Sequence, residues 1–544
     1  MHIQRNKRYY KGKVYRSVLL RQCYYEDKKI KQRTIANLSH MPEHLIRTIE
    51  IAIKEKEAYY KLSDLEFEGG YSYGDIAVLY EIIRSINLDN LIYSRRGVER
   101  DYVIMMIIGR ILHPSSKLEN TRWIKKRWEA FSHFFSVDYD KLKVDDLYKA
   151  LDWVIERKEK IEKNIYKSRS NPTLFLYDIT STYFEGEGAD GSAFGYNRDK
   201  KKGKKQIVIG LVLDKEGYPL SVEVFRGNTS DQKTLKGKVE KMKKMYGIEK
   251  AVLVGDRGMI TEARMKDLQE AGFDFITALT HRRLRELIKD IRSPFQIGLF
   301  DKRSSFEIEY EGKRYILCKS EEREILERRE LASLLWKTRG KLNKIEEQVR
   351  KGKLKDPIKI AERVGRWKNR YKVGRYFEVE IGEGVFRYWV NKEELRLGKK
   401  LLGCYVIVST LGREFSKEEL VERYKSLSLV ENAFKTIKTS LLNIRPIYHW
   451  KGARIKAHAF ICMLSYYVVV EMKKRLKPLF SENGRGRNYS FTFKDILSTL
   501  ALIQIGHIKI LDLSIQQIGK ITPEQRRTLE LLKVELKLKR EVKH

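Results

Sequence analysis

The sequence has few of the features that mark disulfide-bonded, zinc-binding or membrane proteins. Its four cysteines are widely scattered and form no Cys-x-x-Cys pair, so their spacing predicts neither a disulfide framework nor a zinc site. The ten histidines form no His-Glu-x-x-His motif, so oxygen atoms would have to hold any metal ion. The cysteines, which suit a reducing cytoplasm, are Cys23, Cys318, Cys404 and Cys462.

Long apolar runs, internal repeats and low-complexity segments are missing as well. No apolar run approaches the length of a membrane span, and residues 1–13 lack the apolar stretch of a secretory signal. We therefore expect a cytoplasmic protein with no membrane partner.

Positive charge is present in large excess. Lysine and arginine number 111 against 73 acids, which gives a formal net charge of +38 over 544 residues. Such an excess favours a polyanionic partner, and without a membrane segment nucleic acid is the leading candidate. A nucleic-acid partner predicts association with the nucleoid. Composition alone leaves open a second interpretation, a lysine-rich surface of the kind found in heat-adapted proteins.

The chain is long enough for two to four domains, and its patterns change along the sequence. Residues 1–170 are predicted to be mainly helical and to begin with a basic β-hairpin, because aromatic and basic residues alternate over the first forty positions. Asn171-Pro172 breaks the helical pattern.

An α/β pattern begins at residue 171. Three β-rich runs are followed by helix, strand, helix and strand, which predicts a mixed sheet over residues 171–280. We expect a β-rich insertion at 281–415 that contains a charged helix at 321–350. The core then resumes as helices over 416–480, and a C-terminal α/β region at 481–544 is expected to take part in dimerisation.

Two aspartates end apolar strands. Period-two alternation puts Asp178 on the face of Leu174 and Leu176, and it puts Asp256 on the face of two valines. A carboxylate on a core-facing register is costly unless it meets a cation, donors or the open end of the sheet. An aspartate that caps a loop or the next helix would explain either residue equally well.

A third carboxylate lies on the predicted helix at 416–441. At 100° per residue, Tyr424, Glu431 and Lys438 line the edge of its apolar stripe. Helix geometry alone slightly favours a surface pair of Glu431 with Lys435 or Lys438. Together, however, the three acids predict a site for a pair of Mg²⁺ or Mn²⁺ ions that act on a phosphodiester, within a positive surround.

Four segments carry a resemblance to a known family. YDITSTYF (177–184), FRGNTSD (225–231), VGDRGM (254–259) and YKSLSLVENAFKTIK (424–438) resemble the DDE transposases of bacterial and archaeal insertion sequences. The chain is most similar to the branch with a Tyr-Arg-Glu-Lys motif and a β-rich insertion. The resemblance extends over about residues 171–475.

The resemblance implies a ribonuclease-H-like core in which Asp178 lies on the first strand, Asp256 follows the fourth, and Glu431 lies on the helix after the insertion. It makes these three the catalytic metal ligands, and it implies that Tyr424 and Lys438 contact DNA near the cut. The arginine of the motif is replaced here by Leu427.

Other residues of these segments receive weaker roles. The resemblance implies that Asn228 and Asp231 shape the rim of the site, and we expect both, with Arg257, to take part in DNA binding. It also implies that the N-terminal region, residues 1–170, binds DNA ends. Trp389 is expected to be a core residue of a β-strand rather than a platform for an extruded base.

The sequence thus predicts a metal-dependent transposase that cleaves double-stranded DNA at the terminal inverted repeats and joins the ends to target DNA. We expect it to act as a homodimer in the synaptic complex. Two alternatives are a nuclease of the same fold without strand transfer and a DNA-binding protein derived from a transposase. The presence of all three acids argues against the latter.

Overall fold

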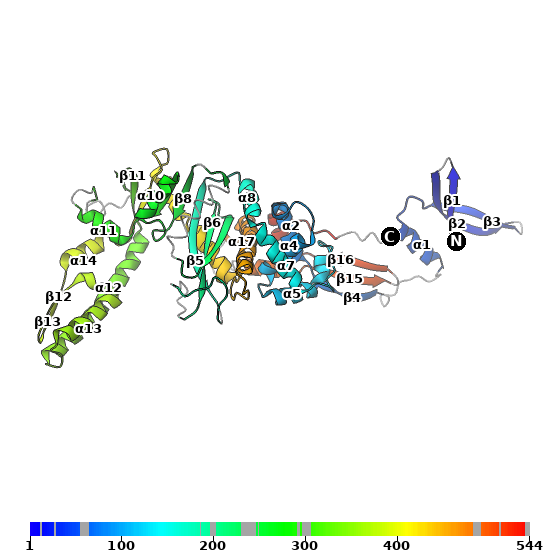
Figure 1. Cartoon of the computed structure of the whole chain (residues 1–544). Coiled ribbons are helices and arrows are strands. Elements are labelled where there is room, and N and C mark those ends of the chain that lie inside the picture. The colour runs from blue at the N-terminus through cyan, green and yellow to red at the C-terminus, as the bar shows by residue number, and fades with distance from the viewer. Residues whose placement is uncertain are drawn as a thin grey trace. The chain divides into compact units, whose positions relative to one another are not determined.

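The computed structural model describes residues 1–538 except for residues 11–12, 27–28, 55–64, 185–186, 196–202, 230–245, 249, 291–293, 296–305, 482–490 and 511–512. Two compact units are formed. Unit 1 comprises Met1–Tyr71 with Gln504–Gly519, and unit 2 comprises Ser72–Ile503 with Lys520–His544 (Figure 1). The predicted boundaries at 170 and 481 therefore do not separate the compact units, because each terminal region contributes to both.

Unit 1 holds two small antiparallel sheets. The expected basic hairpin is part of a three-stranded sheet in the order β1-β2-β3, because the central strand β2 pairs with a strand on each side. A second sheet, in the order β16-β15-β4, joins a strand before residue 73 to the C-terminal β pair. The elements are β1 (His2–Tyr10), β2 (Lys13–Glu26), β3 (Lys29–Asn37), α1 (Glu43–Lys54), β4 (Leu65–Ser72), β15 (Gln504–Ile510) and β16 (Leu513–Ile518).

The strand β4 lies in a stretch that was expected to be helical. Gly70 explains how β15 approaches it, since a side chain there would place its Cβ 2.8 Å from the carbonyl oxygen of Ile505. The pairing partner lies more than 400 residues away in the sequence, so local periodicity could not reveal this strand.

The N-terminal part of unit 2 is a helical layer, as predicted. The central helix of this layer comes from later in the chain: α17 (Gly452–Arg475) packs against α2, α4 and α7 and against strand β7 (Figure 1). The other helices of this layer are α2 (Gly74–Ser85), α3 (Leu88–Ile92), α4 (Val98–Leu112), α5 (Lys117–Lys126), α6 (Trp128–Ser132), α7 (Val144–Glu156) and α8 (Lys158–Ser168). After α17 follow α18 (Lys477–Ser481), the predicted α19 (Phe493–Ala501) and the predicted α20 (Pro523–Leu532).

The helix α17 corrects one expectation, because it is long and apolar enough to cross a membrane by length and composition. In the structure 83% of its apolar window is buried. A helix that is apolar all round and covered by protein on its sides is typical of a core helix.

The main sheet of unit 2 has eight strands in the order β10-β11-β14-β9-β8-β5-β6-β7. The sheet is mixed, as predicted: β5, β6 and β7 are antiparallel neighbours, while β8 and β9 run parallel to β5. The core strands are β5 (Leu174–Tyr183), β6 (Gln206–Leu213), β7 (Pro219–Arg226), β8 (Ala251–Gly255) and β9 (Phe273–Ala278), with α10 (Glu262–Glu270) between the last two.

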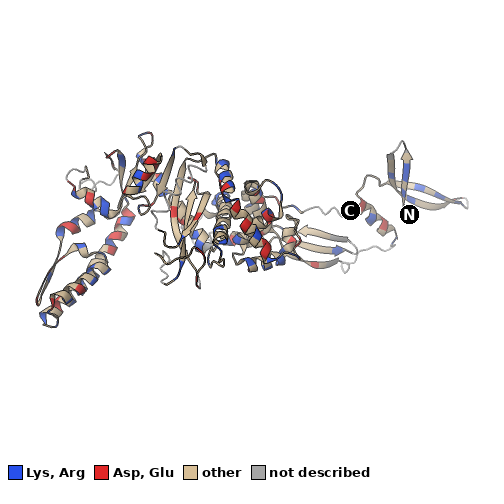
Figure 2. Cartoon of the chain, viewed as in Figure 1, with Lys and Arg blue, Asp and Glu red and all other residues tan. Residues whose placement is uncertain are grey.

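The insertion differs from the expected β-rich domain. Three of its strands extend the main sheet beside β9, and its described residues contain more helix than strand. The predicted charged helix is present as α12 (Glu321–Arg350), with many charged residues along it (Figure 2). It packs against α13 over a small separate core that includes Leu342 and Ile360. The remaining elements are α11 (His281–Lys289), β10 (Phe306–Tyr310), β11 (Lys313–Lys319), α13 (Pro357–Arg370), β12 (Phe377–Gly382), β13 (Val385–Val390), α14 (Lys392–Lys400) and β14 (Cys404–Ser409).

Candidate active site

Two aspartates come together at one edge of the main sheet because of the register between β5 and β8. These strands run parallel, and Tyr177 pairs with Gly255. Asp178 and Asp256 are the next residues along each strand, so the register places them side by side at the C-terminal end of β8. Only Asp256 ends its strand as expected, because β5 continues past Asp178 to Tyr183. Asp178 is half-buried and Asp256 is exposed. The Oδ1 atom of Asp178 accepts a hydrogen bond from the backbone N–H of Ile179 at 2.7 Å.

The third acid lies on a helix that differs from its prediction. Instead of one continuous helix there are three pieces, α15 (Lys417–Lys425), α16 (Ser428–Lys435) and the π-helical turn η4 (Thr436–Ser440). Around Leu427 the hydrogen bonds tighten to three-residue spacing, since its N–H donates to Tyr424 O and its carbonyl accepts from the N–H of Val430. Tyr424, Glu431 and Lys438 therefore do not lie along one straight helix.

The structure brings all three acids to one cavity of about 480 Å³. Helix α16, which carries Glu431, packs against β5 and β6, while α15 lies against β8, β9 and β14. Tyr424 and Leu427, at the junction of the two helices, line the same cavity. The convergence of Asp178, Asp256 and Glu431 on one space is a tertiary arrangement in which a strand, a loop and a helix each contribute one acid.

Cations line the same cavity. Arg257 follows Asp256, and Lys425 ends α15. The insertion contributes Arg323 from α12 and His281 from the start of α11. Burial lowers the pKa of the His281 imidazole, and the charge of Arg257 lowers it further, so this histidine is neutral near pH 7. The cavity thus joins three acids to a basic wall, an arrangement suited to an anionic substrate that also needs cations.

Sequence reasoning missed Arg323, His281 and Lys425. Each lies in a segment where basic residues are common, and no local pattern distinguishes these three from their neighbours. Only the packing of α11 and α12 at the edge of the sheet identifies them.

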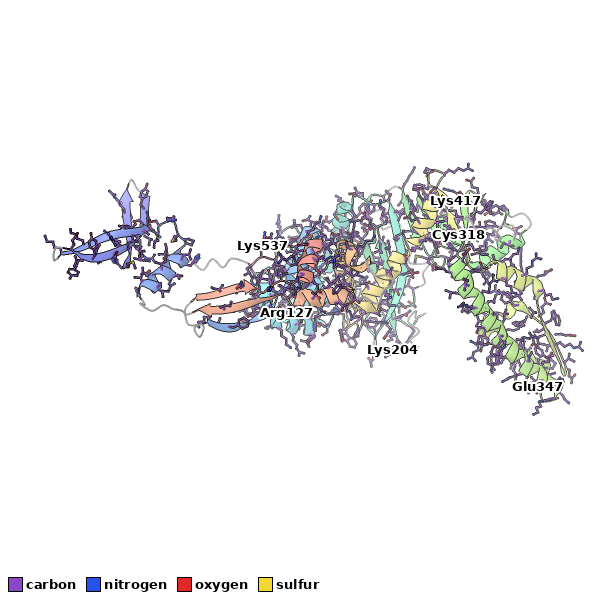
Figure 3. All side chains as sticks on the ribbon, turned by 180° about the vertical axis from the view of Figure 1, so that it is seen from behind. Arg127, Lys204, Cys318, Glu347, Lys417 and Lys537 are labelled. Atoms are coloured by element: carbon purple, nitrogen blue, oxygen red, sulfur yellow. The ribbon has the colours of Figure 1, made fainter. Side chains whose placement is uncertain are left out.

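Tyr424 is placed as predicted, within the site. Burial raises the pKa of its phenol to about 12, and the negative charge of Asp256 contributes in the same direction. Its ring stacks on Tyr405 of β14, with ring centroids 6.4 Å apart. Tyr405 in turn approaches the buried Cys318 of β11, which Figure 3 labels in the same part of unit 2 as Lys417. Tyr424 is therefore a neutral hydrogen-bonding group near physiological pH.

Lys438 is held against the core strand β5, and its contact with DNA stays a prediction. It is 9% exposed, and its Nζ donates hydrogen bonds to Thr180 Oγ1 at 3.2 Å and to the carbonyl of Ser181 at 2.8 Å. Lys438 lies in the π-helical turn η4, and these hydrogen bonds link its ammonium group to β5.

The other predicted residues are less central. Asn228 is exposed in the turn after β7 and does not line the cavity, and Asp231 lies outside the described residues. Trp389 lies on β13 as expected, but it is 48% exposed. The prediction of a core tryptophan is wrong because β12 and β13 form a two-stranded hairpin with one buried face. Tyr388 and Val390 pack on the small core of α12 and α13, and Trp389 lies on the opposite face of β13.

The donor set of the cavity suits a hard divalent cation. The three acids supply only carboxylate oxygens, the ligands that Mg²⁺ and Mn²⁺ prefer. Within the part of the chain that the structure describes, no three His, Cys, Asp or Glu side chains are close enough to hold an ion as they stand. The acids therefore have the right chemistry and share one cavity, and binding would require side-chain movement, as is common in unliganded catalytic sites.

Comparison with known proteins gives two family matches. The model described as "Transposase DDE domain" matches residues 169–468, and "IS1634 family transposase, N-terminal domain" matches residues 3–63. A search of the curated proteins gives no match.

Two solved structures show a distant likeness. A piggyBac transposase synaptic complex with hairpin DNA has a TM-score of 0.35 at 10% identity and covers 79% of this chain and 80% of that chain. A Mos1 transposase paired-end complex with the left transposon end has a TM-score of 0.15 at 10% identity and covers 44% of this chain and 69% of that chain.

Proposed function

The chain belongs to the DDE transposases, whose domain model spans more than half of it, and we propose that Asp178, Asp256 and Glu431 are its metal ligands. The enzyme carries out DNA transposition by metal-dependent cleavage and strand transfer. The observation that carries the proposal for these residues is their convergence on one cavity from three separate elements.

The topology supports a ribonuclease-H-like core. Three antiparallel strands, β5 to β7, are followed by two strands parallel to β5. Asp178 lies on the first strand, Asp256 follows the fourth, and Glu431 lies on the helix after the insertion. These are the positions that the family resemblance implies for the metal ligands.

We propose a pair of Mg²⁺ or Mn²⁺ ions as the cofactor, held by these three carboxylates. Such ions activate a water or a 3′-hydroxyl group and stabilise the leaving oxygen of a phosphodiester. Besides these three carboxylates, the described residues that line the cavity include one thiol, Cys404, and one imidazole, His281. Burial raises the pKa of the Cys404 thiol to about 11, so it is protonated near pH 7.

Other residues of the site bind and orient the DNA strand in this proposal. Arg257 is exposed beside Asp256 and offers its charge to a phosphate, and Tyr424 offers a neutral hydroxyl. Lys438 positions α16 against β5, because its ammonium group links the turn after Glu431 to the strand of Asp178. Asn228 and Asp231 are proposed to shape the rim.

The sheets of unit 1 are proposed to bind the terminal inverted repeats. Strands β1 to β3 carry basic side chains together with exposed aromatic rings, among them Tyr9, Tyr15 and Tyr25. Basic strands reach phosphates, and aromatic rings can contact bases or sugars. Double-stranded target DNA, a homodimer in the synaptic complex and a cytoplasmic location at the nucleoid complete the proposal.

The test uses the purified full-length chain with donor DNA that carries the repeats flanking its own gene. Asp178→Ala, Asp256→Ala and Glu431→Ala should each abolish cleavage in Mg²⁺ and leave DNA binding nearly unchanged. Glu422→Ala is the matched control, since Glu422 is exposed on α15 and does not line the cavity. Normal cleavage by any of the three variants would show that the site is wrongly assigned.

A further inference from the structure

The insertion contributes a well-oriented guanidinium group to the cavity. Arg323 lies in the first turn of α12, and its side chain is 46% exposed. It lines the same cavity as Asp178, Asp256 and Glu431, although it lies more than 100 residues from Glu431 in the sequence. A part of the chain outside the core strands and the helix of Glu431 thus enters the active site.

The orientation of Arg323 is set by a neighbour on its own helix. Its Nε donates to Glu327 Oε1 at 2.6 Å, one helical turn further on. The other carboxylate oxygen of Glu327 accepts a hydrogen bond from the backbone N–H of Gly403 at 2.8 Å. Glu327 therefore ties the guanidinium to the start of β14 as well as to α12.

The start of α12 is itself anchored to the main sheet. The N–H of Ser320 donates to the carbonyl of Gly403 at 2.9 Å. Gly403 has a φ of +71°, and a Cβ there would lie 2.5 Å from the carbonyl oxygen of Ser320. The backbone of β14 can approach the helix this closely only because residue 403 has no side chain. The first turn of α12, which carries Arg323, is therefore held against the backbone at the start of β14.

The outer end of the guanidinium has no partner among the residues that the structure describes. Because Nε is used by Glu327, the two terminal nitrogens are left for a ligand. Two parallel N–H groups on a planar fork match two oxygens of a phosphate. The cavity already contains the carboxylates of the proposed metal site, so a phosphodiester held there would lie between acids and guanidinium.

The neighbouring helix does not supply such a group. Leu427 lines the cavity at the position where the Tyr-Arg-Glu-Lys motif has its arginine. Position 427 therefore carries an apolar side chain, and the guanidinium of this part of the cavity lining comes from α12 instead.

We propose that Arg323 binds a phosphate of the DNA strand at the cut, so that the active site is incomplete without the insertion. The inference rests on the proposed function of the three carboxylates. It makes Arg323 a phosphate-binding residue of the reaction and Glu327 its positioning residue.

The first test compares Arg323→Ala with Arg328→Ala in the full-length protein on donor DNA. Arg328 lies on the same helix, pairs with Glu324 and does not line the cavity. Cleavage by Arg323→Ala should fall on the order of 100-fold, as when one preorganised donor to a reacting centre is removed, and Arg328→Ala should be near wild type. Equal rates for the two variants would overturn the proposal.

A second test asks whether a phosphate is the partner. DNA with an uncharged methylphosphonate is prepared with the substitution at each phosphate within three nucleotides of the cut. When the methylphosphonate replaces the contacted phosphate, Arg323→Ala should not reduce cleavage further than the methylphosphonate itself does. If Arg323→Ala reduced cleavage as strongly on every substituted DNA as on unmodified DNA, Arg323 would contact none of these phosphates.

A third test uses the chain's own leucine. Leu427→Arg in the Arg323→Ala background returns a guanidinium to the cavity from α16 and should raise cleavage at least tenfold above Arg323→Ala alone, since it restores a charged donor in the cavity. No gain would assign the loss in Arg323→Ala to structure and contradict the inference.

The two proposals can fail separately. If Asp178→Ala cleaves normally, the metal site itself is wrong, whatever Arg323 does. If Asp178→Ala is inactive and Arg323→Ala is normal, only the phosphate role of Arg323 is wrong.

Discussion

At the scale of single residues, the three carboxylates of the proposed metal site differ in how firmly the fold holds them. Asp178 lies within a strand that is paired on both sides, and its Oδ1 already accepts a backbone hydrogen bond. Asp256 begins a turn, and Glu431 lies on a helix of eight residues between two irregular segments. We infer that the position of Glu431, more than that of the two aspartates, depends on the contacts that hold its helix against the core.

Lys438 makes two of these contacts. Lys438→Met would keep much of the aliphatic stem but remove the hydrogen bonds that Nζ donates to Thr180 Oγ1 and to the carbonyl of Ser181. The free energy of unfolding should fall by about 1–3 kcal/mol, because buried hydrogen bonds from a charged group are lost. Cleavage should fall as well, while DNA binding stays near wild type. Urea denaturation and cleavage assays check both, with the exposed Lys435→Met as control; equal stability of the two variants would contradict this role.

His449 predicts a dependence of stability on pH. Burial lowers the pKa of His449 to about 3 from 6.5, and the positive charges of Lys117 and Arg110 act in the same direction. Between these two pH values the unfolded chain binds a proton that the folded chain does not, so stability falls as pH drops below about 6.5. His449→Asn should reduce this slope by up to about 1.4 kcal/mol per pH unit. Denaturation midpoints from pH 4.5 to 7.5 measure it, and parallel curves for both proteins would contradict the prediction.

At the scale of elements, irregular junctions determine where the site residues point. The three-residue hydrogen bonds at Leu427 separate α15 from α16, and the π-helical turn after Lys435 rotates Lys438 toward β5. π-Helical turns cost stability relative to a regular helix and are frequent at functional sites. The helix of Glu431 is thus bounded on both sides by changes in helical pitch.

The end of β7 gives a prediction for a single glycine. A Cβ at Gly227 would lie 1.9 Å from the carbonyl oxygen of Gln206 and 2.5 Å from that of Ala193, and backbone atoms cannot move aside as a flexible side chain does. Gly227→Ala should therefore destabilise the protein by about 3 kcal/mol or more.

A glycine in open space serves as the control. Gly340 lies on α12 with no heavy atom within 4 Å of its added Cβ, and Gly340→Ala should stabilise the helix by up to about 1 kcal/mol. Thermal unfolding of both variants tests the pair, and similar shifts in Tm would contradict the steric argument.

At the scale of the whole molecule, the net charge of +38 predicts how DNA binding responds to salt. Binding through six to ten phosphate contacts should weaken by about 10³ to 10⁵ between 50 and 200 mM salt because condensed counterions are released. Part of this charge lies on the helical arm of the insertion, where residues 337–375 contain 15 Lys and Arg but only 4 Asp and Glu (Figure 2). Titrations at several salt concentrations measure the slope, and a flat response would exclude phosphate-dominated binding.

A variant in residues 337–375 tests whether this segment contributes to the salt dependence of DNA binding. Each of Lys351, Lys353 and Lys355, if it contacts a phosphate, should reduce the salt slope by about one unit when it is changed to Ala. A slope that is unchanged in the triple variant would exclude contacts by this part of the arm.

Much of the core could be predicted from the sequence because it depends on neighbouring residues. Period-two alternation located β5 and β8 and put Asp178 and Asp256 on matching faces, and the observed register pairs those faces. The charged helix of the insertion and the C-terminal strands were likewise visible in their own residues. The positive charge that identifies the partner is a sum over the chain and needs no fold.

Only the tertiary structure decided the rest of the site. Helix geometry left Glu431 as an ordinary surface acid, and its place in the cavity follows from how α16 packs on β5 and β6. Arg323 enters the cavity, and Lys438 leaves the surface, for the same kind of reason. Local periodicity reports which face of an element is apolar, but not which distant element covers it, and an active site built from three elements depends on that second fact.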